Sequence, residues 1–292
     1  MVKHSLPPSV AVILVNYDQH QDTIECIHSV RQSVFQPVHI VLVDNGSKPE
    51  SPAKLEEAFP DLPVVRIVDN IKCAGGNNRG IEVALESDAT HILILNNDTI
   101  IDPSAIGELV NADLDVAVPK IVYYDEPTII WSAGAHWRRF PPNILMTGLQ
   151  RPDAPKYNVP RPLDYATGCA FLAKREVFET IGLFDFSYGN YFEDYDFFYR
   201  LRAANFQAGY VPGARVLHKV SRTLGKHPPS QRFYSARNTV FFFRRNDRFP
   251  AWMLWSHMAY VLLREAVKGK FSHLPDYWGG YGEGLRLLKQ EV

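Results

Sequence analysis

Residues 9–17 read SVAVILVNY, an unbroken run of small and branched apolar side chains that stops at Asn16. Runs of Val, Ile and Leu without polar interruption are typical of a strand that is covered on both faces of a sheet. Similar runs recur at 38–43 (VHIVLV), 64–68 (VVRIV) and 91–95 (HILIL). The first hundred residues therefore predict a set of buried strands.

Helix-like segments separate these strands. The first segment has apolar residues at roughly helical spacing, preceded by two residues that often cap helices. The apolar set is Ile24, Ile27, Val30 and Val34, and the expected caps are Asp22 and Thr23. A second helix is predicted at 77–86, between the third and fourth strands. This alternation predicts an α/β fold with a mostly parallel, doubly wound (Rossmann-like) central sheet and helices on both faces.

Polar residues follow three of the predicted strands. Asn16 and Tyr17 follow the first, residues 44–47 (DNGS) the second, and residues 96–99 (NNDT) the fourth. In folds of this class, ligands bind in the crevice beyond the carboxyl ends of the strands. The sequence therefore predicts a site where these strand exits meet.

Asp98, at the exit of the fourth strand, is the first candidate for chemistry. A hard divalent cation prefers oxygen ligands, and a carboxylate here could hold Mg²⁺ or Mn²⁺ against a diphosphate whose oxygens complete the shell. The alternative is a plain turn, because Asn and Asp are common turn formers. Asp44 has the same two interpretations, as a turn residue or as a carboxylate that accepts hydrogen bonds from a ribose or base.

The segment 70–80 (NIKCAGGNNRG) is the second candidate. Gly75 and Gly76 allow close approach of the backbone, the start of the following helix favours an anion, and Arg79 adds a positive charge. The segment matches no established phosphate-binding motif, so an ordinary loop before a helix is the alternative.

Residues 193–196 (EDYD) place three carboxylates at the start of a predicted helix. Neighbouring side chains at a helix start diverge, so one carboxylate can act as a general base while another binds substrate hydroxyls or caps the helix. Glu193 and Asp194 are the candidates for these roles. The alternative is that the acids only compensate the helix dipole. His218, at the end of a Val-Leu-His strand, is either a metal ligand or a structural residue.

The composition narrows the class of protein. The chain has 292 residues, 46% of them hydrophobic and 22% charged, with a formal net charge of −1, which does not suggest a nucleic-acid partner. Cys26, Cys73 and Cys169 are widely spaced, so neither a disulfide framework nor a structural zinc site is expected, and a reducing compartment fits. We expect no secretory signal, a chain that starts near Met1, and no membrane-spanning helix.

The rest of the chain is less regular. Residues 103–162 contain many prolines and an aromatic-rich stretch, and we predict irregular strands and loops that frame an acceptor site. Order returns with a strand at 170–173, a helix from about 174, a helix at 193–205 and a strand that ends at His218. From Ser221 the chain is basic and aromatic and is predicted to be helical.

The C-terminal segment has two interpretations. Seven basic residues and one acid lie between positions 222 and 248, interleaved with aromatic residues, and an apolar run follows at 252–263. The basic residues are Arg222, Lys226, Arg232, Arg237, Arg244, Arg245 and Arg248, and the acid is Asp247. Helices of this kind suit a peripheral contact with an anionic membrane. Packing on the catalytic domain or in a homodimer is the alternative.

These motifs, taken in order, resemble the family 2 inverting glycosyltransferases of the GT-A fold, and among them the rhamnosyltransferase-like members. The resemblance runs roughly from Val10 to His218. It is carried by VILVNY (12–17), DNGS (44–47), NxxxAGGNNRG (70–80), LNNDT (95–99), TGCAFLAKREVFETIGLFD (167–185) and FEDYDFFYRL (192–201).

The resemblance implies roles for individual residues. Asp44 would contact the nucleoside, Asp98 and His218 would bind the metal, and Asp194 would be the general base. The remaining expected nucleotide-site residues are Asn16, Tyr17, Gly76, Asn77, Arg79 and Asn97. Because the motif reads Asn-Asn-Asp where many members have more than one aspartate, Asp98 carries most of the protein charge at that position.

The resemblance also implies an activity. We expect a sugar to move from a nucleotide-diphosphate donor, dTDP-rhamnose or a UDP-sugar, to a saccharide or lipid-linked saccharide acceptor in cell-surface polysaccharide synthesis. The expected location is cytoplasmic, at the inner face of the cell membrane. Residues 1–220 would form the catalytic domain, with a nucleotide-sugar half (about 1–102) and an acceptor half (about 103–220), and residues 221–292 a helical extension.

Two other functions remain open at this stage. A sugar-phosphate nucleotidyltransferase has a similar sheet and uses Mg²⁺, but it presents a glycine-rich basic loop after its first strand, where this chain has Asn16-Tyr17-Asp18. A non-catalytic carbohydrate-binding relative would need the acidic residues only for shape.

Overall fold

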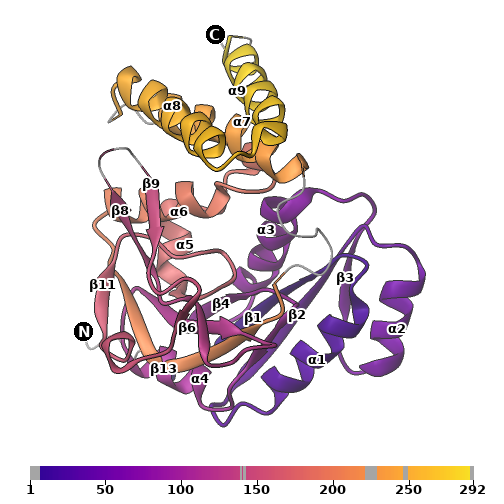
Figure 1. Cartoon of the computed structure of the whole chain (residues 1–292). Helices are drawn as coiled ribbons and strands as arrows, with labels where there is room; N and C mark the ends of the chain where they lie inside the picture. Colours follow the sequence, from indigo (N-terminus) through magenta and orange to yellow (C-terminus); the bar gives the residue numbers. More distant parts are fainter. Residues whose placement is uncertain (1–6, 139, 141–142, 221–228, 246–248, 290–292) are drawn as a thin grey trace.

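A central sheet forms the middle of the molecule in the computed structural model, which describes residues 7–138, 140, 143–220, 229–245 and 249–289 (Figure 1). Its main path runs in the order β10-β7-β6-β12-β4-β1-β2-β3. The four N-terminal strands are β1 (Val10–Asn16), β2 (Val38–Asn45), β3 (Val64–Ile67) and β4 (His91–Leu95), paired in parallel. The predicted buried strands and the mostly parallel sheet are confirmed.

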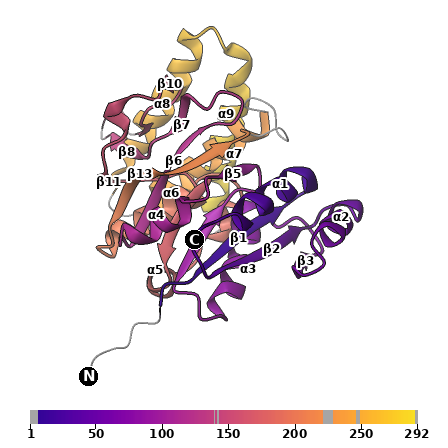
Figure 2. The ribbon, with the colours of Figure 1, turned by 90° about the horizontal axis from the view of Figure 1, so that it is seen from below.

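Helices cover both faces of this sheet, as predicted. Ala11 and Ile13 of β1 face the side covered by α3 (Lys72–Leu85), α5 (Arg175–Ile181) and α6 (Glu193–Ala203). Val10, Val12 and Leu14 face the side covered by α1 (His20–Arg31), α2 (Glu50–Ala58) and α4 (Ala105–Asn111). Figure 2 shows α1 and α2 beside the N-terminal strands. Both faces of β1 are buried, which explains its continuous apolar sequence.

Two later strands bring distant residues to the carboxyl end of β4. β12 (Ala170–Lys174) lies antiparallel between β4 and β6 (Val116–Tyr123). β13 (Ala208–His218) pairs with β5 (Thr99–Ile101), and the register places His218 opposite Thr99. His218 therefore lies next to the turn that contains Asp98.

The proline-rich middle of the chain forms short strands, as expected. β7 (Ile129–Ser132), β10 (Arg151–Pro152) and β11 (Arg161–Leu163) extend the main sheet, and β8 (Ala135–Arg138) and β9 (Asn143–Met146) form a separate hairpin. Short 3-10 turns occur at η1 (Pro155–Tyr157) and η2 (Phe186–Tyr188). The β8–β9 hairpin points toward the C-terminal helices (Figure 1).

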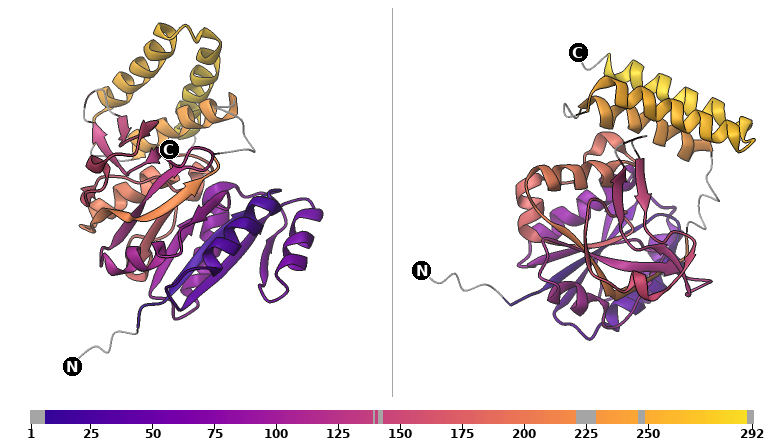
Figure 3. Two further views of the ribbon diagram at one scale, coloured as in Figure 1. Left: turned by 60° about the horizontal axis from the view of Figure 1, so that its bottom comes forward. Right: turned by 60° about the vertical axis from the view of Figure 1, so that its left-hand side comes forward.

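The C-terminal extension is helical, as predicted. It comprises α7 (Pro229–Arg245), α8 (Ala251–Val267), η3 (Phe271–His273) and α9 (Leu274–Leu288). These helices form a layer on one side of the catalytic part (Figure 3). Phe242 of α7 packs among the rings of Phe192, Tyr195 and Tyr199, at and near the start of α6. Among the described residues, no helix is long and apolar enough to cross a membrane.

Two details of the first predicted helix are wrong. Asp22 and Thr23 do not cap α1 but lie in its first turn, because the helix begins at His20 after Gln19. Val34 lies beyond the end of α1 and is 75% exposed, so it does not extend the buried apolar face.

The second predicted helix begins earlier than expected, at Lys72 instead of Asn77, so Gly75 and Gly76 lie inside α3. A Cβ atom at Gly76 would approach Val15 Cγ1 to 2.8 Å, and one at Gly80 would approach Ile13 Cγ2 to 2.3 Å. The glycines therefore let the helix lie close against the sheet. The low helix propensity of glycine is the reason that the sequence pattern suggested a loop. The close packing on the sheet outweighs that low propensity.

Candidate active site

A chain of hydrogen bonds joins the exits of β4, β1 and β2. Asn97 Nδ2 donates to Thr23 Oγ1 (2.9 Å), and Thr23 Oγ1 donates to Asn16 Oδ1 (3.0 Å). Asn16 Nδ2 then donates to Asp44 Oδ1 (2.7 Å). The predicted convergence of the strand exits is therefore present. Thr23, which was expected only to cap a helix, supplies the central link.

Asp44 is fixed in orientation by this chain. It is 3% exposed, and its Oδ2 accepts a hydrogen bond from the Ser47 backbone N–H (3.3 Å). Asn16 is fully buried and also donates to Ser47 Oγ and Ser51 Oγ. Tyr17, by contrast, is 42% exposed. The DNGS motif is thus a rigid polar corner beside an accessible aromatic ring.

The start of α3 is not open to an anion. The Cys73 N–H donates to Asn190 Oδ1 (2.8 Å), and the Ala74 N–H donates to the Gly189 carbonyl oxygen (2.9 Å). The predicted phosphate-binding helix start is therefore wrong, because the loop before α6 already satisfies these donors. This loop is more than a hundred residues away in the chain, and no local pattern indicates that it docks here.

The other residues expected from this segment are not brought together. Asn77 is buried and donates to the Cys73 carbonyl oxygen (3.0 Å). Arg79 lies on the exposed side of α3, where it pairs with Glu82 at 3.2 Å, and its side chain is 46% exposed. Gly76 contacts the sheet. Within the described part of the chain, the side-chain contacts of Asn77 and Arg79 go to Cys73 and Glu82 and not to Asp44 or Asp98.

Asp98 and His218 form a buried pair. His218 Nε2 lies 3.2 Å from Asp98 Oδ1, and the two side chains are 5% and 9% exposed. The Trp131 ring packs edge-on against His218, with the ring centroids 4.6 Å apart. Burial alone would lower the pKa of His218, but the neighbouring Cys169 and Asp98 raise it to about 10.

These residues fit a cation that a substrate helps to bind. His218 Nδ1 is buried without a hydrogen-bond partner among the described residues, and a carboxylate lies beside the ring. His218 must lose its proton to bind a metal, and an imidazole nitrogen and a carboxylate oxygen are then ligands that Mn²⁺ and Mg²⁺ accept. In the described ranges, no group of three or more His, Cys, Asp or Glu residues could hold a metal ion. Phosphate oxygens and water would have to complete the shell.

Asp194 lies close to this pair through two adjacent residues. The Gly168 N–H donates to Asp194 Oδ2 (3.0 Å). The next residue, Cys169, accepts a hydrogen bond on its carbonyl oxygen from the Asn96 N–H (2.8 Å), two residues before Asp98. Adjacent Cα atoms are about 3.8 Å apart, so both carboxylates are at the same end of β12.

The Asp194 carboxylate is held by three hydrogen bonds. Tyr165 Oη donates to Oδ2 (2.6 Å), the Gly168 N–H donates to the same oxygen, and the Tyr195 N–H donates to Oδ1 (2.9 Å). Burial raises the pKa of Asp194, and these hydrogen bonds oppose that rise. The result is an oriented carboxylate of increased basicity, which suits a general base.

Glu193 is in a different environment from Asp194. It is 8% exposed, and its Oε2 has no hydrogen-bond partner among the described side chains and backbone. Burial first and the Asp194 carboxylate second raise the pKa of Glu193 to about 8. Asp196, the third acid, pairs with Arg200 at 2.7 Å. The acidic cluster thus divides into one candidate base, one buried acid and one structural partner of an arginine.

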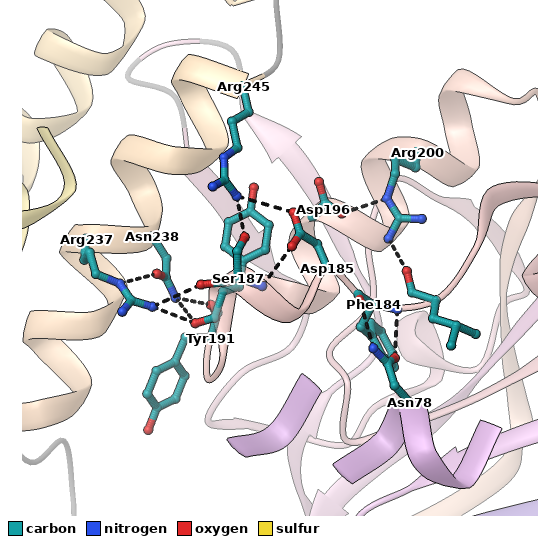
Figure 4. A network of polar contacts seen from close by, with 12 residues as sticks. Asn78, Phe184, Asp185, Ser187, Tyr191, Asp196, Arg200, Arg237, Asn238 and Arg245 are labelled. Atoms are coloured by element: carbon teal, nitrogen blue, oxygen red, sulfur yellow. Dashed lines mark hydrogen bonds and ion pairs between the residues drawn. The ribbon is translucent and has the colours of Figure 1, made fainter. Parts of the chain in front are cut away.

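The backbone just before these acids is strained. Tyr191 and Phe192 have φ values of 66° and 76°, a left-handed conformation that costs non-glycine residues energy. Asn238 of α7 is fully buried and donates through Nδ2 to the carbonyl oxygens of Tyr188 (2.9 Å) and Tyr191 (2.6 Å). Figure 4 shows this side chain directed at the turn. α7 therefore helps to hold the loop that presents Asp194.

Further contacts tie the same loop to its surroundings (Figure 4). Arg237 Nη2 donates to the Tyr188 carbonyl oxygen (2.9 Å). Asn78 of α3 accepts from the Phe184 N–H (3.0 Å) and donates to its carbonyl oxygen (2.8 Å). The loop thus has fixed contacts on both sides before Asp194 is reached.

Sequence reasoning missed Tyr165 and Asn238. Asn238 left one signal, because it is a polar residue close to the apolar run 240–243 (VFFF) of the predicted helix. Tyr165 left none that separates it from other tyrosines.

Known proteins similar to this chain are glycosyltransferases. The family model described as Glycosyl transferase family 2 matches residues 10–182. A low-salt glycan biosynthesis hexosyltransferase of Haloferax volcanii is 26% identical over 222 residues, with 74% of this chain and 69% of the relative covered. An N-acetylglucosaminyl-diphospho-decaprenol L-rhamnosyltransferase of Mycobacterium tuberculosis is 25% identical over an alignment of 292 residues, with 89% of this chain and 93% of the relative covered.

Two solved structures share the fold. One is a mannosyltransferase from Pyrobaculum calidifontis in complex with GDP-Man and Mn²⁺, with a TM-score of 0.60, 14% identity, and 96% of this chain and 88% of that chain covered. The other is GalNAc-T7 with UDP, GalNAc and Mn²⁺, with a TM-score of 0.59, 19% identity, and 76% of this chain covered. This chain spans 45% of the GalNAc-T7 chain.

Proposed function

The chain belongs to glycosyl transferase family 2, and from this membership we propose that it is an inverting enzyme that transfers a sugar from a nucleotide-diphosphate donor to a saccharide or lipid-linked saccharide acceptor. The resemblance seen in the motifs and the GT-A fold are confirmed. The family match favours a glycosyltransferase over the two alternatives, a sugar-phosphate nucleotidyltransferase and a non-catalytic carbohydrate-binding relative. The observation that supports the proposal is the oriented Asp194 carboxylate, which is bonded to Gly168, because the next residue, Cys169, is bonded to Asn96 near Asp98.

In the proposed reaction, Asp194 accepts the proton of the acceptor hydroxyl. The hydroxyl oxygen attacks the anomeric carbon from the face opposite the diphosphate, a new glycosidic bond forms, and the bond to the diphosphate oxygen breaks. Tyr165 and the Gly168 N–H keep the carboxylate facing one direction, so little reorganisation is needed when the proton moves. Direct attack from the opposite face inverts the configuration of the sugar.

Asp98 and His218 are the residues that would hold Mg²⁺ or Mn²⁺. A bound divalent cation supplies positive charge next to the leaving diphosphate. The pair is buried, which strengthens electrostatic interactions there. Both solved structures that share the fold are complexes with Mn²⁺, which supports a divalent cation here as well.

For the nucleotide we propose the polar corner at the β1 and β2 exits. Asp44 would contact the nucleoside, with the exposed Tyr17 ring beside it, and Asn16 and Asn97 would keep the corner in shape. Asn77, Gly76 and Arg79 would form the adjoining α3 wall. The GalNAc-T7 structure contains UDP and the mannosyltransferase structure contains GDP-Man. For this chain we propose dTDP-rhamnose or a UDP-sugar as the donor.

A peripheral membrane contact fits the C-terminal helices in part. Three of the expected basic residues lie outside the described residues, namely Arg222, Lys226 and Arg248, and so does the acid Asp247. Phe241, Phe242 and Phe243 of α7 are buried in the protein, so they cannot meet a membrane, whereas α8 exposes Trp255 (55%) and Leu263 (65%). We propose that this α8 face contacts the inner face of the cell membrane, where a lipid-linked acceptor in cell-surface polysaccharide synthesis would be reached.

That contact is tested with anionic vesicles. Trp255→Glu with Leu263→Glu should abolish co-sedimentation, whereas Trp278→Glu on α9, where Trp278 is 68% exposed, should not. Equal pelleting of all three proteins would contradict it. A homodimer through this face would instead appear as a concentration-dependent dimer in sedimentation experiments.

The proposed activity is tested by Asp194→Asn. We expect nucleotide-sugar binding, measured by thermal shift with Mn²⁺ or Mg²⁺, to be retained and turnover to fall by at least about a hundredfold. Asp61→Asn, which changes an exposed acid far from the site in sequence, should be fully active. Full activity of Asp194→Asn would exclude Asp194 as the base. Analysis of the anomeric configuration of the product tests inversion.

A further inference from the structure

A cavity of about 570 Å³ lies between the catalytic part and the C-terminal helices. Its walls come from the β8–β9 hairpin, α6, α7 and α8, so neither part of the chain forms it alone. Side chains that line it include Trp137, Ile144, Phe198, Phe242 and Met253. The volume is within the range of roughly 300–1,000 Å³ that is typical of pockets for small ligands.

The cavity shares a wall with the proposed base. Tyr165 and Tyr195 line it, and the centroids of their rings are 4.5 Å apart. The hydroxyl group of Tyr165 is bonded to Asp194 Oδ2, and the backbone N–H of Tyr195 is bonded to Oδ1. The two rings therefore separate the cavity from the carboxylate, and a ligand in the cavity lies next to the acceptor side of the reaction.

The lining suits hydrocarbon better than sugar. Its charged side chains are Asp164 and Arg202, which are paired with each other at 3.0 Å, and the Tyr165 hydroxyl is already bonded to Asp194. Few of the remaining lining groups could bond the hydroxyl groups of a saccharide, and each hydroxyl group left without a partner costs about 1–3 kcal/mol. Aromatic and aliphatic walls instead favour an apolar chain.

The mouth of the cavity is apolar and exposed. Trp252 lines the cavity and is 56% exposed, and Phe140 also lines it and is 67% exposed. Their ring centroids are 6.3 Å apart. Trp252 is on the same helix as the exposed Trp255 and Leu263, so the opening is continuous with the apolar face of α8.

One guanidinium group lines the cavity. The Arg202 side chain is 54% exposed and pairs with Asp164 at 3.0 Å, so an anionic group would bind there in competition with this carboxylate. A lipid-linked saccharide carries an anionic phosphate or diphosphate between its chain and its sugar. Guanidinium groups are well suited to bind such a group.

We infer that this cavity binds the hydrocarbon chain of a lipid-linked acceptor, next to its phosphate group. The inference rests on the proposed function and adds to it a site for the lipid part of the substrate. The same cavity excludes acceptors whose polar part would have to lie among the aromatic rings.

The test uses the full-length protein and farnesyl diphosphate as the probe, with inorganic diphosphate as the reference. Ala203 lines the cavity and is exposed at the end of α6, so Ala203→Trp should fill the mouth without removing any packing. Ala204→Trp is the matched control, because Ala204 is equally exposed and does not line the cavity. Unchanged melting temperatures check that both variants fold.

Isothermal titration calorimetry should show that farnesyl diphosphate binds at least about tenfold more tightly than inorganic diphosphate, with a negative heat-capacity change from apolar burial. Ala203→Trp should remove this difference, and Ala204→Trp should keep it. Equal affinity for the two probes, or a difference that survives Ala203→Trp, would overturn the inference. A dimer that covers the cavity, detected by sedimentation and broken by Ala203→Trp, would also overturn it.

Failure of the proposed function gives a different result. If the chain bound no nucleotide sugar in the thermal-shift experiment but bound farnesyl diphosphate as described, the proposed donor chemistry would be wrong and the lipid cavity would stand. If the chain bound a nucleotide sugar but showed no preference for farnesyl diphosphate, the proposed donor chemistry would stand and the lipid cavity would be wrong.

Discussion

Tyr165 donates a hydrogen bond of 2.6 Å to Asp194, from one edge of a cavity that the C-terminal helices complete. The ring packs beside Tyr195 and against Phe198, so it has little freedom to move. This one contact connects the orientation of the proposed base with the packing of the acceptor side. The site therefore depends on α6, α7 and α8 as well as on the strand exits.

Tyr165→Phe should move the acid limb of the pH profile of kcat/KM to higher pH. The hydrogen bond stabilises the ionised Asp194 and lowers its pKa, so its loss raises the pKa of the base further. A hydrogen bond to a charged group contributes about 1.5–3 kcal/mol, so the displacement of the acid limb should be large enough to measure. Tyr195→Phe is the control, because Tyr195 contacts Asp194 through its backbone N–H. An unchanged acid limb would contradict the assignment.

Asp98→Asn should weaken metal-dependent nucleotide binding. Loss of one carboxylate charge from a pair of protein ligands should raise the concentration of Mn²⁺ needed for half-maximal activity by at least about tenfold. Removal of divalent cations with a chelator should abolish turnover in the parent protein, and added Mn²⁺ should restore it. Asp61→Asn should titrate like the parent. If the Mn²⁺ titration of Asp98→Asn were unchanged, Asp98 would not belong to the metal site.

Asn238→Ala should destabilise the protein and reduce turnover together. The change leaves the Tyr191 carbonyl oxygen without its Asn238 donor and the Tyr188 carbonyl oxygen with Arg237 in place of two donors, at a cost of about 1–3 kcal/mol, and it releases the left-handed residues before Glu193. Urea unfolding measures the loss of stability, and kcat reports the orientation of Asp194.

Thr239→Ala provides the comparison for that experiment. Thr239 is also buried in α7, but its hydroxyl bonds only the Ser235 carbonyl oxygen of its own helix. We expect its kcat to match that of the parent. If Asn238→Ala had normal stability and normal kcat, the strained turn would not depend on Asn238 for its conformation.

Glu193→Gln should flatten the pH dependence of stability. The pKa of Glu193 is raised from 4.5 to about 8 in the folded chain, so in that interval the folded state keeps a proton that the unfolded state has lost. The contribution of Glu193 to the free energy of unfolding is therefore fully present below pH 4.5 and is lost as the pH rises toward about 8. The slope is up to about 1.4 kcal/mol per pH unit.

The measurement is the free energy of unfolding in urea at several pH values between about 5 and 8. The parent should lose more stability across this range than Glu193→Gln does. Glu86→Gln, at an exposed position of the chain, should behave like the parent. Parallel curves for the parent and Glu193→Gln would mean that Glu193 is ionised in the folded protein.

Much of the fold could be predicted from the chain itself, because its strongest signals are local. A strand buried on both faces, such as β1, must be apolar at every position, and this pattern is visible without any knowledge of its neighbours. The parallel arrangement also places all strand exits at one edge, so the meeting of Asn16, Asp44 and Asn97 followed from topology.

Local signals failed where a distant segment decides the outcome. The glycine pair in α3 looked like a loop, but close packing on Val15 makes it part of a helix. The start of that helix looked open to an anion, but Asn190 and the Gly189 carbonyl occupy it.

By itself, the sequence determined the α/β sheet, the polar strand exits, the candidates Asp98, Asp194 and His218, and the family. Only the tertiary structure decided which groups orient them: Tyr165 for Asp194, Asn238 for the turn before it, and the C-terminal helices for the cavity beside it. The physical reason is the distance along the chain over which each kind of interaction acts. Hydrophobic periodicity and turn chemistry act between near neighbours in the chain, whereas a hydrogen bond to a buried carboxylate depends on the packing that brings remote segments into contact.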